Sequence, residues 1–168
     1  MPAEALISVQ EYLSTSYRPD CDYVDGHIEE RNAGEWDHGD LQLRVAAYFL
    51  ARRKQWGIRV VPEQRVQVKP DRFRVPDVCV VLGDPGEQVL TKPPFICVEV
   101  LSPDDRMSRV EQRIDDYLAM GVPNVWVLDP QTRKAFTATA ERGLCEVKSG
   151  SLKTVNPDLE VPLPEIFE

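Results

Sequence analysis

The chain of 168 residues is 42% hydrophobic and 29% charged, proportions that suit one soluble domain over residues 1–168. Its apolar runs fall far short of the ~20 residues that a membrane span needs, and its first residues lack the basic flank and cleavage site of a signal peptide, so we expect a cytoplasmic protein. The net charge of −8 argues against a broadly basic surface, and two histidines and four cysteines without zinc spacing exclude a multi-histidine or zinc-finger centre.

In the first third of the chain, capping residues and an apolar period of helical spacing predict two helices with a hairpin between them. Ser8 followed by Glu11 resembles a capping box at the start of a short helix. An Asp-Gly pair between apolar residues predicts a hairpin over Tyr23–Ile28. From Asp37 to about Gln55 the apolar residues recur at helical spacing, and Gly57 follows as a stop signal.

Beyond Gly57 the apolar period changes to that of strands, with proline and glycine between the segments. The expected strands are Ile58–Val61, Arg65–Val68, Val75–Leu82, Phe95–Leu101, Val125–Leu128, Ala135–Thr139 and Leu144–Val147. Asp104 to about Met120 is expected to be a second long helix, and the proline-rich tail from Asn156 is expected to wrap around the surface. This order predicts an α/β fold with a mixed central sheet flanked by helices.

Two acidic residues interrupt otherwise apolar strands. Glu99 lies in the middle of Phe-Ile-Cys-Val-Glu-Val-Leu, and Asp77 lies near the start of Val-Pro-Asp-Val-Cys-Val-Val-Leu. A buried carboxylate is costly unless it is paired or coordinates a metal, and Mg²⁺ binds one or two carboxylates, a backbone carbonyl and several waters. The spacing alone leaves alternatives open, because Asp77 could cap a turn after Pro76 and Glu99 could pair with an arginine such as Arg113.

At these residues the sequence resembles the Uma2-type restriction endonucleases of the PD-(D/E)xK nuclease superfamily. The similar segments, between about Ser8 and Phe167, are VQEYL, DYVDGHI, the His38 region, VPDVCVV, VEVLSPD, DDYLAMGVPNVWVLDP and LPEIF. Each segment is weak by itself, whereas their order and spacing are specific. The resemblance implies a restriction-endonuclease-like α-β-β-β-α-β core, in agreement with the expected elements.

The resemblance also implies a metal site. It makes Asp77 the acid of the PD motif and Glu99 the acid of the (D/E)xK motif, which hold Mg²⁺, or Mn²⁺ as a substitute, together with the carbonyl of Val100. The superfamily lysine would stand where this chain has Leu101, and Uma2-like proteins use a lysine on the next helix, a position that Arg113 occupies here. Arginine can stabilise charge on a phosphorane, but with a pKa above ~12 it is a poor proton acceptor.

Further polar residues are candidates for the same site. His38 matches a family histidine at the start of the first long helix, where it could lie near the metal, contact phosphate, or simply bond to the backbone. Glu63 and Gln64 could also point into the site. Three acids are expected to be turn residues: Asp22, Asp25 and Asp129.

We therefore expect a Mg²⁺-dependent endonuclease that hydrolyses phosphodiester bonds in DNA and acts as a homodimer. The expected catalytic residues are Asp77, Glu99, Arg113 and His38, and the expected metal ligands are Asp77, Glu99 and Val100. A catalytically degenerate nuclease fold that binds nucleic acid or another partner is the alternative, supported by Leu101, by Arg109 where the family commonly has aspartate, and by the acidic balance. A hydrolase of another phosphodiester or nucleotide is a third possibility.

Basic residues gather in two stretches despite the acidic balance. The first group is Arg44, Arg52, Arg53, Lys54 and Arg59, and the second is Arg65, Lys69, Arg72 and Arg74. Composition alone does not distinguish a nucleic-acid contact surface from ordinary solvated faces.

Overall fold

The computed structural model describes residues 4–32 and 34–168. Its elements, in chain order, are α1 (Val9–Ser14), β1 (Asp22–Val24), β2 (His27–Glu29), α2 (Trp36–Ala51), α3 (Arg53–Trp56), β3 (Ile58–Pro62), β4 (Val66–Lys69), β5 (Arg72–Arg74), β6 (Val78–Leu82), β7 (Ile96–Val100), α4 (Met107–Met120), β8 (Asn124–Asp129), β9 (Lys134–Thr139), β10 (Gly143–Glu146), β11 (Ser151–Lys153), β12 (Glu160–Pro162) and α5 (Leu163–Phe167). Among the described residues, no helix is both long enough and apolar enough to cross a membrane.

The central sheet has six strands in the order β10-β9-β8-β7-β6-β3. Strands β7 and β8 run parallel, whereas the other neighbouring pairs are antiparallel. Parallel neighbours need a crossover connection, and α4 provides it between β7 and β8. The succession α2, β3, β6, β7, α4, β8 forms the α-β-β-β-α-β core, and the predicted mixed α/β fold is confirmed.

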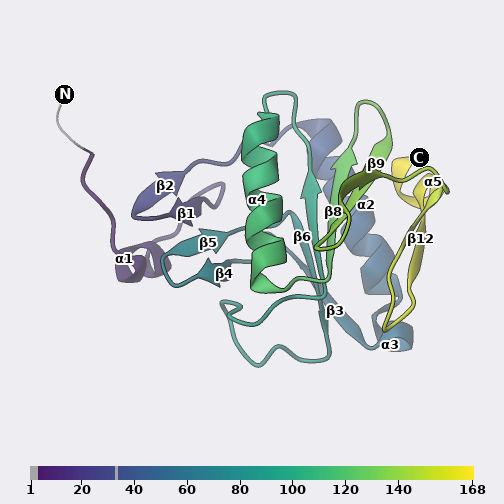
Figure 1. The fold of residues 1–168 in the computed structure, drawn as a ribbon, viewed down its shortest axis with the longest axis horizontal. Coiled ribbons are helices and arrows are strands. Elements are labelled where there is room, and N and C mark those ends of the chain that lie inside the picture. The colour runs from purple at the N-terminus through teal and green to yellow at the C-terminus, as the bar shows by residue number, and fades with distance from the viewer. Residues whose placement is uncertain (1–3, 33) are drawn as a thin grey trace.

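Helices cover both faces of this sheet, with α4 on one side and α2 on the other (Figure 1). On the α2 side, Phe49 packs in one core cluster with Trp126 of β8 and Ile166 of α5. On the α4 side, Ile114 packs in a second cluster with residues of β6, β7 and β8. Every residue of β7 is therefore buried, as its apolar sequence predicts.

A second sheet, with the strand order β2-β1-β5-β4, lies beside α4 (Figure 1). It contains the predicted hairpin, in which Asp25 and Gly26 adopt positive φ between β1 and β2. It also contains β5, a strand that the sequence analysis missed. The strand that was expected over Val75–Leu82 begins only at Val78, as β6, and residues 75–77 connect it to β5, which ends at Arg74.

The proline-rich tail differs from its expected surface position. Strands β11 and β12 pair, and α5 follows directly and packs against α2. Leu159, Val161 and Ile166 of this tail are buried in the α2-side core. Prolines and acids separate the apolar residues of the tail in the sequence, so the sequence does not show that these apolar residues complete the core.

Candidate functional site

The strand register brings the two predicted acids to the same place. In the β6–β7 pair, Cys79 lies opposite Cys97 and Val78 lies opposite Val98, so that Asp77 lies opposite Glu99 when the register is continued by one residue. Side chains alternate between the faces of a strand, and the two cysteines belong to the α4-side cluster. Asp77 and Glu99 therefore point to the same face.

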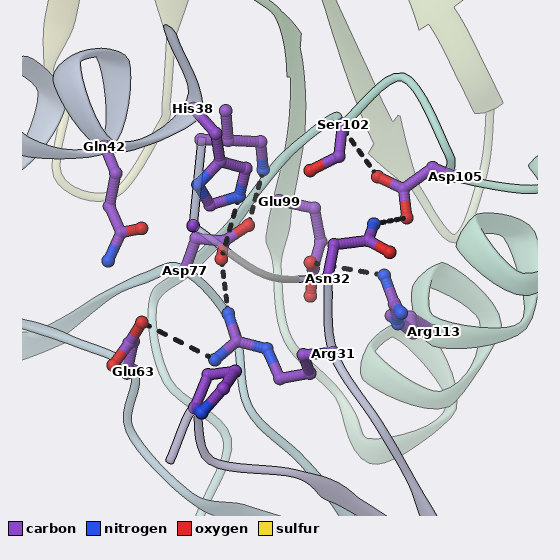
Figure 2. A pocket seen from close by; sticks show the side chains of 14 residues that line it. Arg31, Asn32, His38, Gln42, Glu63, Asp77, Glu99, Ser102, Asp105 and Arg113 are labelled. Atoms are coloured by element: carbon purple, nitrogen blue, oxygen red, sulfur yellow. Dashed lines mark hydrogen bonds and ion pairs between the residues drawn. The ribbon is translucent and has the colours of Figure 1, made fainter. Parts of the chain in front are cut away.

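Both acids line one cavity of about 190 Å³, shown in Figure 2. The wall includes all five residues that the sequence analysis named as catalytic or as ligands: His38, Asp77, Glu99, Val100 and Arg113. They come from α2, from the start of β6, from β7 and from α4. The structure thus brings the candidates together, while their roles in catalysis and metal binding stay predictions.

Asp77 is almost completely buried and has three partners. Its Oδ1 accepts a hydrogen bond from the guanidinium of Arg31 and lies 3.4 Å from Nε2 of His38. Its Oδ2 accepts a hydrogen bond of 2.7 Å from the backbone N–H of Val100. Burial raises the pKa of Asp77, but these contacts outweigh burial and lower the pKa below its ordinary value. Asp77 is therefore ionised.

Glu99 is buried to a similar degree, at 4% exposure, with fewer partners. Its Oε1 accepts a hydrogen bond of 2.6 Å from the hydroxyl of Tyr117, and its Oε2 lies 3.8 Å from Nη1 of Arg113. Burial and the charge of Asp77 raise the pKa of Glu99 to about 7, because Arg113 and Tyr117 offset only part of their effect. The negative charge of this acid is thus incompletely compensated by the protein.

The Glu99–Arg113 contact matches part of the alternative that Glu99 forms a structural ion pair. Arg113 is shared, however, because its Nε lies 3.5 Å from Oδ2 of Asp22. Asp22 also contacts Arg74 at 3.1 Å and is 1% exposed. The expectation that Asp22 is a turn acid is therefore wrong: it is the buried first residue of β1, a strand with a neighbour on each side.

The other expected turn acids do lie in turns. Asp25 adopts a positive φ of 51° in the hairpin. Asp129 ends β8, and its side chain accepts hydrogen bonds from the backbone N–H groups of Gln131 and Thr132.

Arg31 is the most important site residue that the sequence analysis missed. Besides its contact with Asp77, its Nη1 lies 3.7 Å from Oε1 of Glu63, which also lines the cavity (Figure 2). Gln64 faces away, because its amide donates to the carbonyls of Arg65 and Gln88. The sequence around Arg31 is a polar stretch before a helix, and nothing in that pattern distinguishes the residue from a solvated loop arginine.

A second missed group joins two loops at the cavity mouth. The side-chain amide of Asn32 donates to Oδ1 of Asp105 at 2.8 Å, and Oδ2 of Asp105 accepts from the backbone N–H of Ser102 at 2.7 Å. The segment before α2 is thereby connected to the loop between β7 and α4 (Figure 2).

The two acids of the cavity offer carboxylate oxygens, which are the ligands that a hard divalent cation prefers. Residues 4–32 and 34–168 contain no group of three or more His, Cys, Asp or Glu side chains arranged to hold a metal. Mg²⁺ needs fewer, since it commonly binds one or two carboxylates and keeps several waters. A cavity of about 190 Å³ has room for such waters, each of which takes ~30 Å³. Two acids on one cavity wall, one of them incompletely neutralised, therefore fit Mg²⁺ chemically, whereas the described residues of that wall, with one histidine and no cysteine, do not form a zinc ligand set.

Comparisons with known proteins agree with this architecture. A crystal structure described as "a putative nuclease belonging to DUF820 from Anabaena variabilis ATCC 29413" is similar with a TM-score of 0.82 and 20% sequence identity, over 96% of this chain and 97% of that one. That similarity shows a shared fold. No curated protein matches the chain. The model of the Uma2 family, described as "Putative restriction endonuclease", matches residues 9–167, and because this match spans nearly the whole chain, the protein belongs to the Uma2 family.

Proposed function

We propose that this protein is a Mg²⁺-dependent endonuclease that hydrolyses phosphodiester bonds in DNA, with Asp77 and Glu99 as the metal-binding acids. The observation that carries the proposal is the shared cavity of these two buried carboxylates, one of which lacks full charge compensation. The family description and the nuclease-like fold support the same reaction class. Mn²⁺ would substitute for Mg²⁺, and the carbonyl of Val100 is the proposed third protein ligand.

The protein holds Asp77 in one orientation before any ligand arrives. The backbone N–H of Val100, the guanidinium of Arg31 and the imidazole of His38 surround its two oxygens. The N–H of Val100 and the imidazole orient the carboxylate as the partners of a metal ligand do, whereas the guanidinium of Arg31 would compete with a cation for Oδ1. When bound, the cation would polarise the scissile phosphate and lower the pKa of an attacking water.

Cationic side chains on the cavity wall are suited to an anionic phosphodiester. Although burial lowers the pKa of Arg113, the charges of Glu99 and Asp22 outweigh it and raise that pKa further, so this guanidinium stays protonated. Arg113 would therefore stabilise negative charge on the phosphate and would not accept a proton from water. For His38, the contact with Asp77 outweighs burial and raises the pKa, which favours the charged form as a phosphate contact.

The proposal includes a homodimer, because two active sites are needed to cut both strands of a duplex together. A catalytically degenerate nucleic-acid-binding module is the second candidate. It is favoured by one observation, namely that Arg31 already neutralises Asp77. That candidate predicts DNA binding without cleavage, and little loss of binding in Asp77→Asn.

Nicking of supercoiled plasmid DNA in the presence of Mg²⁺ or Mn²⁺ tests the proposal. Because a bound cation supplies several kcal/mol of transition-state stabilisation, Asp77→Asn and Glu99→Gln should each reduce nicking by about a hundredfold or more. The exposed Glu111 on α4 provides the matched control, and Glu111→Gln should nick normally.

Full nicking by both acid variants would contradict the proposed site. Binding of DNA by the wild-type protein without any nicking would favour the degenerate module. Hydrolysis of a small chromogenic phosphodiester without nicking would indicate a different phosphodiester substrate.

A further inference from the structure

Helix α2 is apolar on two opposite faces. One face packs into the core through Leu41, Val45 and Phe49. The other carries Trp36, Leu43 and Leu50, whose side chains are 84%, 67% and 49% exposed. These three residues are spaced by seven, which places them in one stripe along a helix with 3.6 residues per turn.

Small residues separate the three large side chains of this stripe. Gly39 and Ala47 are both exposed, and no atom lies within 4 Å of where a Cβ on Gly39 would stand. A helix that is apolar on both faces is usually buried on both, and an exposed apolar patch of this kind marks an interaction surface. Small residues between the large ones leave space for the side chains of an opposing helix.

Charge is distributed unevenly along the same surface. Acidic residues lie toward its start: Glu35, Asp37 and Asp40. Arg44 lies at the middle of α2, where it pairs with Asp40 of the same helix at 2.8 Å, and the further basic residues Arg53 and Lys54 lie in α3, just beyond the end of α2. Two copies of this surface placed antiparallel would bring the acidic end of each helix to the basic end of the other.

We propose that α2 pairs antiparallel with α2 of a second copy of this chain, about a twofold axis at Leu43. In this register Trp36 packs against Leu50 of the partner subunit, and Gly39 faces Ala47 of the partner subunit. On one flank, Asp40 lies beside Arg44 of the partner subunit. On the other flank, Glu35 lies beside Arg53 of the partner subunit.

The twofold arrangement uses the same patch on both subunits, as closed dimers do. A single pair of helices falls below the ~1,200 Å² of typical stable interfaces, so the dimer should dissociate on dilution. Nucleic acid is a poorer occupant, because an apolar stripe flanked by acids as well as bases does not suit a phosphate backbone. This surface is the contact of the homodimer in the proposed function and needs neither the metal nor the reaction, although Gly39 also lines the cavity of the two acids.

Sedimentation velocity over a wide concentration range tests this surface. The wild-type chain should shift from monomer to dimer as concentration rises, and Leu43→Asp should weaken association by at least about a hundredfold. Leu144 provides the matched control, since it is an exposed leucine on β10, away from α2, and Leu144→Asp should associate normally. Because Leu43 is exposed, both variants should keep the far-ultraviolet circular dichroism of the wild type.

Charge exchange tests the antiparallel register. A double variant Arg44→Glu/Arg53→Glu has acids at both ends, and a double variant Glu35→Lys/Asp40→Lys has bases at both ends. Each should be monomeric alone, and an equimolar mixture should form a dimer about as tight as the wild type.

The outcomes separate this inference from the rest of the proposed function. Dimerisation that Leu43→Asp does not affect would overturn the α2 surface and leave the homodimer intact. A mixture that stays monomeric would overturn the antiparallel pairing. A wild-type chain that is monomeric at every concentration would overturn both the α2 surface and the homodimer, whereas plasmid nicking would still test the proposed reaction. If the chain is monomeric and Leu43→Asp loses DNA binding, the stripe is a contact for nucleic acid.

Discussion

Replacing Glu99 by glutamine should stabilise the metal-free protein, by an amount that grows as the pH rises from about 4.5 to about 7. The side chain is 4% exposed, and its pKa is raised from the ordinary value of 4.5 to about 7, first by burial and then by Asp77. Each tenfold change in an ionisation equilibrium corresponds to ~1.4 kcal/mol, so ionised Glu99 costs the folded state about 3 kcal/mol. Glutamine has nearly the same shape as protonated glutamate and can still accept the hydrogen bond from Tyr117.

The sign of the pH dependence follows from linkage. Below about pH 4.5 the acid is protonated in both the folded and the unfolded state, and it contributes no difference. Between about pH 4.5 and pH 7 the unfolded state loses the proton first, so the free energy of unfolding of the wild type falls with rising pH. The full cost is present above about pH 7. The advantage of Glu99→Gln should therefore be small at pH 5 and reach about 3 kcal/mol at pH 8.

Urea denaturation followed by circular dichroism, at both pH values and with a chelator present, measures this difference. The exposed Glu111 again provides the control, because Glu111→Gln replaces the same group without burial and should change stability little at either pH. Equal stability of Glu99→Gln and wild type at pH 8, or an equal gain at both pH values, would refute the account of an uncompensated buried charge.

Three further predictions concern the residues around the acids and the tail. Arg31→Gln should lower the stability of the metal-free protein and raise its Mn²⁺ affinity about tenfold in calorimetry, because the substitution removes a cation that competes for Asp77. Unchanged or weaker Mn²⁺ binding would contradict this competition. Arg74→Met leaves three contacting carboxylates without this partner and should cost about 3–5 kcal/mol in urea denaturation, whereas a loss below 1 kcal/mol would show that other groups neutralise them. Ile166→Ala should cost about 2–5 kcal/mol if the tail belongs to the core, and a neutral result would return it to the surface.

The acid pair could be predicted because its members contrast with their surroundings. Asp77 and Glu99 are charged residues in apolar segments, and antiparallel pairing of adjacent strands places them opposite each other. Their energetic cost makes a partner necessary, which is why the local pattern already indicates a site. The central sheet and its two long helices were predictable for a related reason, since their apolar periods are long and regular.

The remaining site residues depend on contacts that lie far apart in the sequence. Arg31 reaches Asp77 across 46 positions, and Arg74 reaches Asp22 across 52. A polar residue in a polar stretch has the same local pattern whether it is solvated or buried in an ion-pair network. The local pattern of Asp22 is therefore that of a turn acid, although the residue is buried and contacts Arg74 and the backbone N–H of Val75.

Calorimetric titration of Mn²⁺ into the chelator-treated protein tests most directly whether the two buried acids form a metal site. The wild type should bind one ion per chain, and both Asp77→Asn and Glu99→Gln should lose this binding, the latter while becoming more stable at pH 8. A loss of binding that accompanies a gain in stability cannot be attributed to unfolding. Absence of binding to the wild type, or binding that neither substitution weakens, would contradict the account.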